Sequence, residues 1–118
     1  TMNHIELGQK GEDLAVEHLI KNGYSVLKRN FRFKNAEIDI VCEKNKQLII
    51  VEVKTRTTAI IGEPYLAVTR NKQKQIIKVA NKYIEDNMIS LDVRLDVVSI
   101  VLNQYGLKLE HIEDAFHP

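Results

Sequence analysis

Residues 36–56 read AEIDIVCEKNKQLIIVEVKTR, and this stretch decides the fold that we expect. Two alternating apolar runs, 38–41 and 48–51, flank a polar loop, which is the pattern of a β-hairpin. The tightest turn places Asn45 and Lys46 as its two loop residues. The sequence therefore predicts two long antiparallel strands at the centre of the domain.

This register sets Asp39 opposite Glu52 and Glu37 opposite Lys54. Two facing carboxylates lie roughly 5 Å apart at Cβ, and at an effective dielectric of about 20 their repulsion is about 3 kcal/mol. We therefore expect a cation between Asp39 and Glu52: Lys54 in part, and a hard divalent metal such as Mg²⁺. The alternative is that one carboxylate points into bulk water. The metal is favoured because these charges interrupt strongly apolar strands.

Length and composition predict one soluble domain spanning residues 1–118, with 44% hydrophobic and 28% charged residues. The single cysteine, Cys42, falls in a predicted strand and is expected to be a core residue in a reducing cytoplasm. No apolar run reaches the length of a membrane span, so we expect a cytoplasmic protein with no membrane partner.

The charge is unevenly distributed although the net charge is only +1. Between residues 54 and 82 every charged residue except Glu63 is basic, whereas acids predominate from Glu85 onwards. A basic zone of this kind suits a polyanion, because each neutralised phosphate releases condensed counterions. The alternative is a solvated helix face.

The remaining elements follow from periodicity and from glycine and proline positions. We expect the following elements: a helix over 6–22 that ends at Gly23, a strand over 24–33, a loop over 55–64, a helix within 65–88, and strands over 94–102 and 107–112. The order is α-β-β-β-α-β-β, which predicts an α/β domain with a mixed sheet flanked by helices. The second helix carries an apolar stripe of Ile76, Ile77, Ala80, Tyr83, Ile84 and Met88.

Several side chains allow more than one reading. Gly8 and Gly11 are disfavoured within a helix and suggest close approach of another backbone or a ligand. Phe31 and Phe33 could stack on bases, although core packing is more common. Asp96 needs a buried partner, and Arg94 or a helix lysine could supply it. Glu12 alone predicts only a solvated acid in the first turns of a helix. The four histidines are too scattered in sequence for a zinc motif.

The motifs Glu-Ile-Asp-Ile (37–40) and Val-Glu-Val-Lys-Thr-Arg (51–56) resemble the YraN family of bacterial proteins. That family is grouped with the PD-(D/E)xK, restriction-endonuclease-like superfamily, to which Holliday junction resolvases also belong. The resemblance covers nearly the whole chain and departs from the usual pattern at Ala36, where the family usually has glycine. It continues through Gly8, Gly11-Glu12, Ala15, Gly23-Tyr24, Arg29-Asn30, Gly62, Pro64, Ala67-Val68, Lys72, Asp96-Val97-Val98 and Ala115-Phe116.

The resemblance implies a restriction-endonuclease-like fold and a Mg²⁺- or Mn²⁺-dependent endonuclease that cuts DNA, branched DNA included. Asp39 and Glu52 resemble the superfamily's metal-binding acids, and Lys54 resembles its catalytic lysine. Glu12 would be a further metal ligand, as in archaeal-type resolvases, which reverses the reading given above.

Five basic residues would position the DNA backbone without reading its sequence: Lys28, Arg29, Arg32, Arg56 and Lys72. Glu37 would influence the charged state of Lys54. Two alternatives stay open: a nucleic-acid-binding module with little or no turnover, and an interaction domain in which the acids anchor a structural cation. Related resolvases act as dimers, so a homodimer is compatible with this reading, although the sequence has no obvious dimer stripe.

Overall fold

The computed structural model describes residues 2–58 and 68–118. Its elements are α1 (His4–Lys21), β1 (Ser25–Phe33), β2 (Ala36–Lys44), β3 (Gln47–Arg56), α2 (Arg70–Asp86), β4 (Asp92–Asn103) and β5 (Gly106–Ile112). The predicted α-β-β-β-α-β-β order is therefore confirmed. The predicted loop begins later than expected, because residues 55 and 56 still pair with β4. Gly62, Glu63, Pro64 and Ala67 lie outside the described residues.

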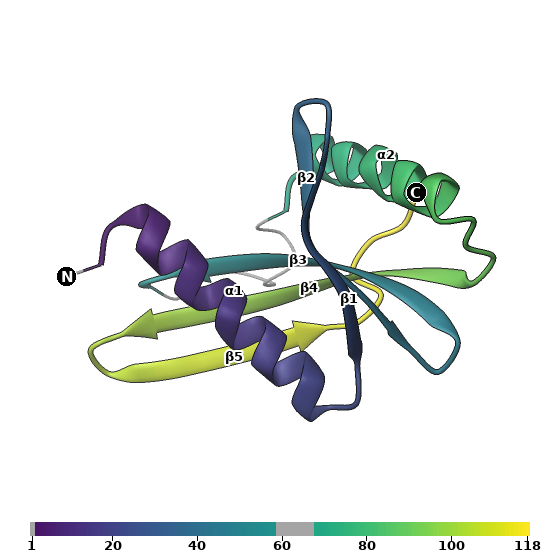
Figure 1. Cartoon of the computed structure of the whole chain (residues 1–118). Coiled ribbons are helices and arrows are strands. Elements are labelled where there is room, and N and C mark those ends of the chain that lie inside the picture. The colour runs from purple at the N-terminus through teal and green to yellow at the C-terminus, as the bar shows by residue number, and fades with distance from the viewer. Residues whose placement is uncertain (1, 59–67) are drawn as a thin grey trace.

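The five strands form one mixed sheet in the order β1-β2-β3-β4-β5. All neighbours are antiparallel except β3 and β4, which run parallel and are separated in the chain by α2. The two helices cover opposite faces of the sheet (Figure 1). This is the flanked mixed sheet that the restriction-endonuclease-like resemblance implies.

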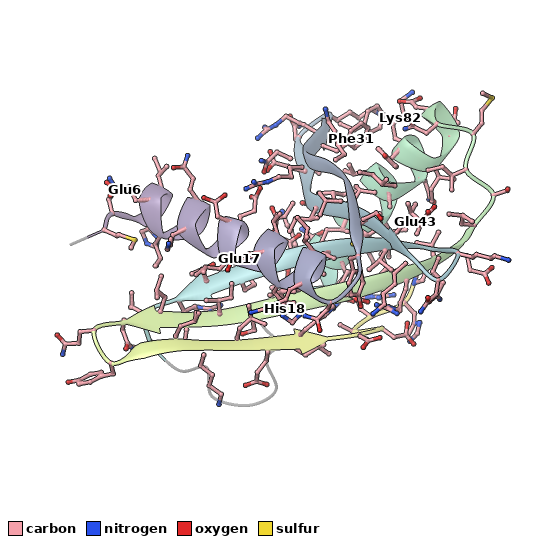
Figure 2. The ribbon with its side chains drawn as sticks, turned by 60° about the horizontal axis from the view of Figure 1, so that its bottom comes forward. Glu6, Glu17, His18, Phe31, Glu43 and Lys82 are labelled. Carbon is pink, nitrogen blue, oxygen red and sulfur yellow. The ribbon has the colours of Figure 1, made fainter. Side chains whose placement is uncertain are left out.

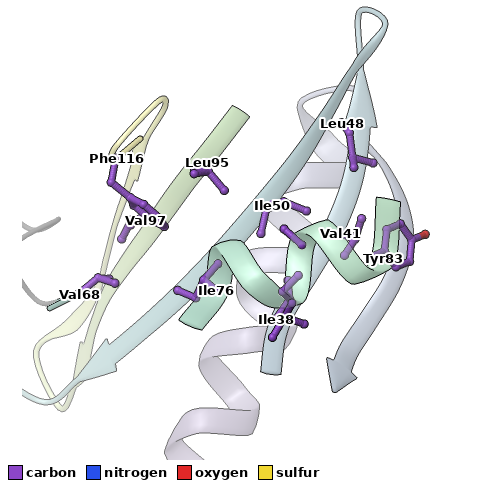
Figure 3. Close-up of a cluster of buried hydrophobic side chains, with 12 residues drawn as sticks. Ile38, Val41, Leu48, Ile50, Val68, Ile76, Tyr83, Leu95, Val97 and Phe116 are labelled. Carbon is purple, nitrogen blue, oxygen red and sulfur yellow. The ribbon is translucent and has the colours of Figure 1, made fainter. Parts of the chain in front are cut away.

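Two hydrophobic cores lie on the two faces. Alternate residues of β3 enter each one: Leu48 and Ile50 pack under α2, and Ile49 and Val51 pack under α1. The core under α2 is shown in Figure 3, where side chains from β2, β3, β4 and the helix meet. The predicted burial of β4 on both faces is confirmed, since every residue over 95–100 is buried.

The central hairpin has the predicted turn and the predicted register near that turn. Asn45 and Lys46 have φ values of 50° and 62°, as a two-residue primed turn requires. Pairing then runs from Lys44–Gln47 to Ile40–Val51 and stops there. The expectation that Asp39–Glu52 and Glu37–Lys54 continue this ladder is wrong, because β2 and β3 separate before these positions.

Beyond that point the two strands have different neighbours. Residues 36–38 of β2 pair only with β1, and residues 52–56 of β3 pair only with β4. The far half of the β1–β2 hairpin turns out of the plane of the other strands and lies against α2 (Figure 1). Ile40 and Val51 form the last pair between β2 and β3. We call the place just beyond this pair, where β2 and β3 separate at Asp39, the fork.

The helices begin and end close to their predicted limits. Asn3 caps α1 by accepting a hydrogen bond from the Glu6 amide at 2.9 Å, and Gly23 follows the helix with a φ of 87°. Thr69 caps α2 in the same way. The prediction that Met88 belongs to the apolar stripe is wrong: α2 ends at Asp86, and Met88 is 91% exposed.

Other core predictions hold. Phe31 packs edge-to-face on Tyr83 with ring centroids 5.1 Å apart, and Phe33 also packs against the core under α2. Figure 2 shows Phe31 on β1 close to the helix that carries Lys82.

Cys42 is fully buried, as predicted, and this burial raises the pKa of its thiol to about 12. Within the described residues, no helix is long and apolar enough to cross a membrane.

Candidate functional site

Asp39 bridges the two strands at the fork. Where the backbone ladder has ended, its Oδ2 accepts a hydrogen bond from the Val53 amide of β3 at 2.8 Å. The side chain thus replaces a missing ladder bond and ties β2 to β3. As a result, the Asp39 carboxylate is fixed beside Glu52, although the two residues are not paired through their backbones.

Glu52 is an acid in an apolar setting, with only 5% of its surface exposed. Its Oε2 is buried and has no hydrogen-bond partner among the described residues. Burial, followed by the neighbouring carboxylate of Asp39, raises the pKa of Glu52 to about 9, while the charges of Lys72 and Lys54 act in the opposite direction. The pair therefore disfavours two negative charges unless a cation joins it.

Glu12 reaches the same region because Gly11 lets α1 approach β3 closely. A Cβ atom at Gly11 would lie 2.7 Å from Thr55 Cβ, a distance that real side chains do not allow. The close-approach reading is thus confirmed for Gly11, whereas Gly8 would meet nothing within 4 Å. The side chain of Glu12 is only 14% exposed, so its reading as a solvated acid is wrong.

The Glu12 carboxylate has two donors on β1. Its Oε1 accepts hydrogen bonds from Arg29 Nε at 3.1 Å and from Asn30 Nδ2 at 3.0 Å. Burial raises the pKa of Glu12 above its usual value, the Arg29 hydrogen bond opposes this rise, and Asp39 adds to it. The Asp39 carboxylate is therefore close enough to repel the charge of the Glu12 carboxylate.

A cleft of about 780 Å³ opens between α1 and strands β1, β2 and β3. Five of the predicted site residues line it: Glu12, Arg29, Glu37, Asp39 and Lys54. Lys54 is half-buried here. Glu37 accepts a hydrogen bond from Arg32 at 2.9 Å, so its carboxylate is already paired with a cation other than Lys54.

The donor set suits a hard divalent cation in part. Carboxylate oxygens are the ligands that Mg²⁺ and Mn²⁺ prefer, and the partnerless Oε2 of Glu52 fits such an ion. Over residues 2–58 and 68–118, however, no three His, Cys, Asp or Glu side chains are grouped closely enough to hold a metal. The nucleus of the site is therefore the pair Asp39–Glu52, with Glu12 nearby but held by β1.

The predicted DNA-contacting residues occupy varied surroundings. Lys28 and Arg56 are exposed, and Lys72 of α2 is half-buried, with its charge felt at Glu52. Arg29 forms ion pairs with Glu12 and with Asp13, the second at 2.7 Å. Arg32 is paired with Glu37.

A second buried acid, Asp96, lies on the α1 face of the sheet. Arg94 donates to both of its oxygens at 2.9 Å, which confirms the predicted structural pairing. His111 Nε2 lies 2.8 Å from Oδ2, and the Asp114 amide donates to Oδ1 at 3.0 Å. Burial raises the pKa of Asp96, but the bonds from His111 and Arg94 outweigh it and leave this pKa below its usual value. Asp96 is therefore a satisfied structural carboxylate.

Sequence reasoning missed one contact in this network. His18 Nε2 of α1 lies 3.1 Å from His111 Nδ1 of β5, with the rings edge to face. Figure 2 labels His18 near the end of α1, on the side towards the sheet. Burial, and then His111, lowers the pKa of His18 below its usual value. The two residues are 93 positions apart, so no local pattern could have linked them.

The fold and the site define a small mixed α/β domain with a buried glutamate, a half-buried aspartate and nearby lysines at a strand fork. A family model described as uncharacterised protein family UPF0102 matches residues 11–100. The chain belongs to this family, which is the YraN family that the motifs resemble.

Relatives of similar length extend over almost the whole chain. A UPF0102 protein of Clostridium beijerinckii is 46% identical, with 94% of this chain and 93% of the relative covered. Those of Flavobacterium johnsoniae and Christiangramia forsetii are 44% and 43% identical, covering 97% and 96% of this chain and 96% and 95% of the relatives. Among solved structures, SfsA of Pyrococcus furiosus in complex with Ca²⁺ matches with a TM-score of 0.36 and 14% identity. This match covers 91% of the present chain and 62% of SfsA, so the chain spans less than two thirds of SfsA.

Proposed function

We propose that this protein is a metal-dependent endonuclease that hydrolyses phosphodiester bonds in DNA, branched DNA included. The observation that carries the proposal is the buried, partnerless Oε2 of Glu52 beside Asp39. A buried carboxylate beside a second carboxylate does not stabilise a domain, because desolvating its charge costs several kcal/mol. A hard divalent cation, Mg²⁺ or Mn²⁺, offsets both charges and takes oxygen ligands.

Asp39 and Glu52 would hold this cation, with Glu12 as a further ligand from α1. When bound, the ion supplies positive charge that activates water and offsets the charge that builds up on the phosphate. The Val53 amide orients Asp39, and the surrounding core keeps bulk water away from Glu52. Both acids are thus set in place by the fork before any substrate arrives.

Lys54 is the residue with the chemistry for the phosphate itself. It lines the cleft, is half-buried, and carries a charge that is felt at Glu52. A lysine in this position can orient the attacking water and donate a hydrogen bond to the phosphate oxygens. Lys72, Lys28, Arg32 and Arg56 would hold the DNA backbone around it by charge, without reading bases.

The proposal is tested by incubating branched, flapped and linear DNA with the protein and Mg²⁺ or Mn²⁺. We expect cleavage by the wild type and strong loss of cleavage in Lys54→Ala and Asp39→Asn, while Lys108→Ala retains it. Lys108 is a matched control because it is a 75% exposed lysine on β5, outside the cleft. All four proteins are purified in the same way, so a contaminating nuclease would act equally in each.

Three outcomes separate the candidate functions. Metal-dependent cleavage that Lys54→Ala abolishes supports the endonuclease. Salt-dependent DNA binding without cleavage by any variant supports the binding module instead. If the protein binds no nucleic acid even at low salt, only a structural or interaction role for the acid pair is left. Equal cleavage by the wild type and Lys54→Ala contradicts the role given to this lysine.

A further inference from the structure

The contacts of Glu12 single out Asn30, a residue to which no role has been assigned. Its side-chain amide donates to Glu12 Oε1, the same oxygen that accepts from Arg29 Nε. Among the described residues, no hydrogen bond reaches the other oxygen, Oε2. Two donors thus anchor one oxygen of this carboxylate and leave the second one for another ligand.

The backbone of Asn30 is unusual for a strand. Its φ is 54°, in the left-handed region, where asparagine is tolerated better than most residues. Its neighbours Arg29 and Phe31 pair with Ile40 and Ile38 of β2, so Asn30 lies level with Asp39 without pairing to it. β1 is therefore locally distorted beside the fork, at the one residue whose amide meets Glu12. Such strain is retained where the surroundings require it.

The charge of Arg29 is shared between two acids. Its guanidinium contacts Glu12 Oε1 at 3.1 Å and Asp13 Oδ1 at 2.7 Å. The three residues together keep one net negative charge, so Arg29 orients Glu12 without cancelling its attraction for a cation. The planar guanidinium has several N–H donors and can bridge two acids in this way, whereas a lysine ammonium cannot reproduce this geometry.

We infer that Asn30 and Arg29 are positioning residues of the metal site: they anchor Oε1 of Glu12 so that Oε2 is available to a divalent cation held by Asp39 and Glu52. This inference rests on the proposed function, whose metal it concerns. It differs from the role that the sequence suggested for Arg29, because the guanidinium is directed to acids of the protein itself. Partners that orient a metal ligand typically contribute about 10- to 100-fold to metal affinity.

The test is calorimetric titration of the folded protein with MnCl₂, with DNA affinity measured separately in EDTA. Asn30→Gly removes the amide but keeps the backbone freedom that a φ of 54° demands. Asn45→Gly is its matched control, since Asn45 has a φ of 50° at the β2–β3 turn, away from the cleft. Arg29→Lys retains the charge and loses the planar guanidinium.

We expect the Kd for Mn²⁺ to rise about 10-fold or more in Asn30→Gly and Arg29→Lys and to stay unchanged in Asn45→Gly. DNA affinity in EDTA should be the same in all four proteins. If Asn30→Gly does not fold, Arg29→Lys carries the comparison.

Wild-type Mn²⁺ affinity in both Asn30→Gly and Arg29→Lys would overturn the inference, as would a wild-type protein that binds no Mn²⁺. If instead the wild type binds Mn²⁺ with the expected differences and yet cuts no DNA, the proposed function fails while the positioning role stands.

Discussion

Replacing Glu52 by glutamine should stabilise the protein, and increasingly so as the pH rises. The pKa of Glu52 is about 9 in the folded protein, against 4.5 for an ordinary glutamate. Between these values the folded state binds one proton more than the unfolded state, so raising the pH lowers the free energy of unfolding. Glutamine keeps the shape of the protonated acid and has no proton to lose.

The size of the effect follows from proton linkage. Between the unfolded and folded pKa values of Glu52, each increase of one pH unit lowers the free energy of unfolding by about 1.4 kcal/mol. From about pH 5 to about pH 8 the wild type should therefore lose up to about 4 kcal/mol relative to Glu52→Gln. Because Glu52 is buried, solvent screening reduces this value little. Asp39 raises the pKa of Glu52 less than burial does, so Asp39→Asn should weaken this pH dependence only in part.

The assay is urea unfolding in EDTA across this pH range for the wild type, Glu52→Gln and Glu43→Gln. Glu43 is an exposed glutamate at the other end of the hairpin, labelled in Figure 2, and its variant should follow the wild type. Parallel curves for the wild type and Glu52→Gln would refute the reasoning, because the carboxyl would then titrate alike in both states. Millimolar Mg²⁺ should raise wild-type stability at the alkaline end and leave Glu52→Gln unchanged.

Three further predictions concern packing and the second acid network. Gly11→Ala should destabilise the protein by about 1–3 kcal/mol, because its new methyl group would overlap with β3. Gly8→Ala should stabilise the protein by up to about 1 kcal/mol, because its methyl group would meet nothing within 4 Å. Thermal unfolding of both variants measures the two effects, and similar changes in melting temperature would argue against the close contact at Gly11. Asp96→Asn should cost about 1–3 kcal/mol at neutral pH, because Arg94 loses its buried acidic partner and keeps only the ion pair with the exposed Glu113. Because the pKa of Asp96 is lowered, the difference in unfolding free energy between this variant and the wild type should shrink as the pH falls below about 4. Urea unfolding at each pH measures this difference, and a constant value would contradict the charged state assigned to Asp96. Because folding lowers the pKa of His18, the unfolded chain binds a proton at this residue more readily than the folded protein, so wild-type stability should decrease as the pH falls below about 6.5. In acid unfolding experiments His18→Gln should lack this part of the decrease. The same dependence of stability on pH in both proteins would show that folding does not change the protonation of His18.

The parts of the fold that the sequence could predict are those set by local chemistry. The turn at Asn45–Lys46 and the alternation on either side of it determine the register near the turn, and this register is confirmed. The apolar run of β4 predicted a strand buried on both faces, and it is one. Arg94 and Asp96 are two residues apart on this strand, so their pairing was accessible as well.

The fork could not be predicted, because it results from competition between distant partners. β3 continues along β4 while β2 follows β1 towards α2, and only the assembled sheet determines where they separate. Asp39 is bonded to Val53 as a consequence, rather than lying opposite Glu52 in a ladder. Arg29 shows the same limit: a basic residue in a basic stretch suggested DNA, whereas the fold supplies it with two acids from α1.

The central claim is that Asp39 and Glu52 hold a divalent cation at the fork. Crystals grown with MnCl₂ and measured for the anomalous scattering of manganese test it most directly. The account predicts a manganese peak within about 2.6 Å of oxygens from both carboxylates. The absence of a manganese peak at the fork would contradict it.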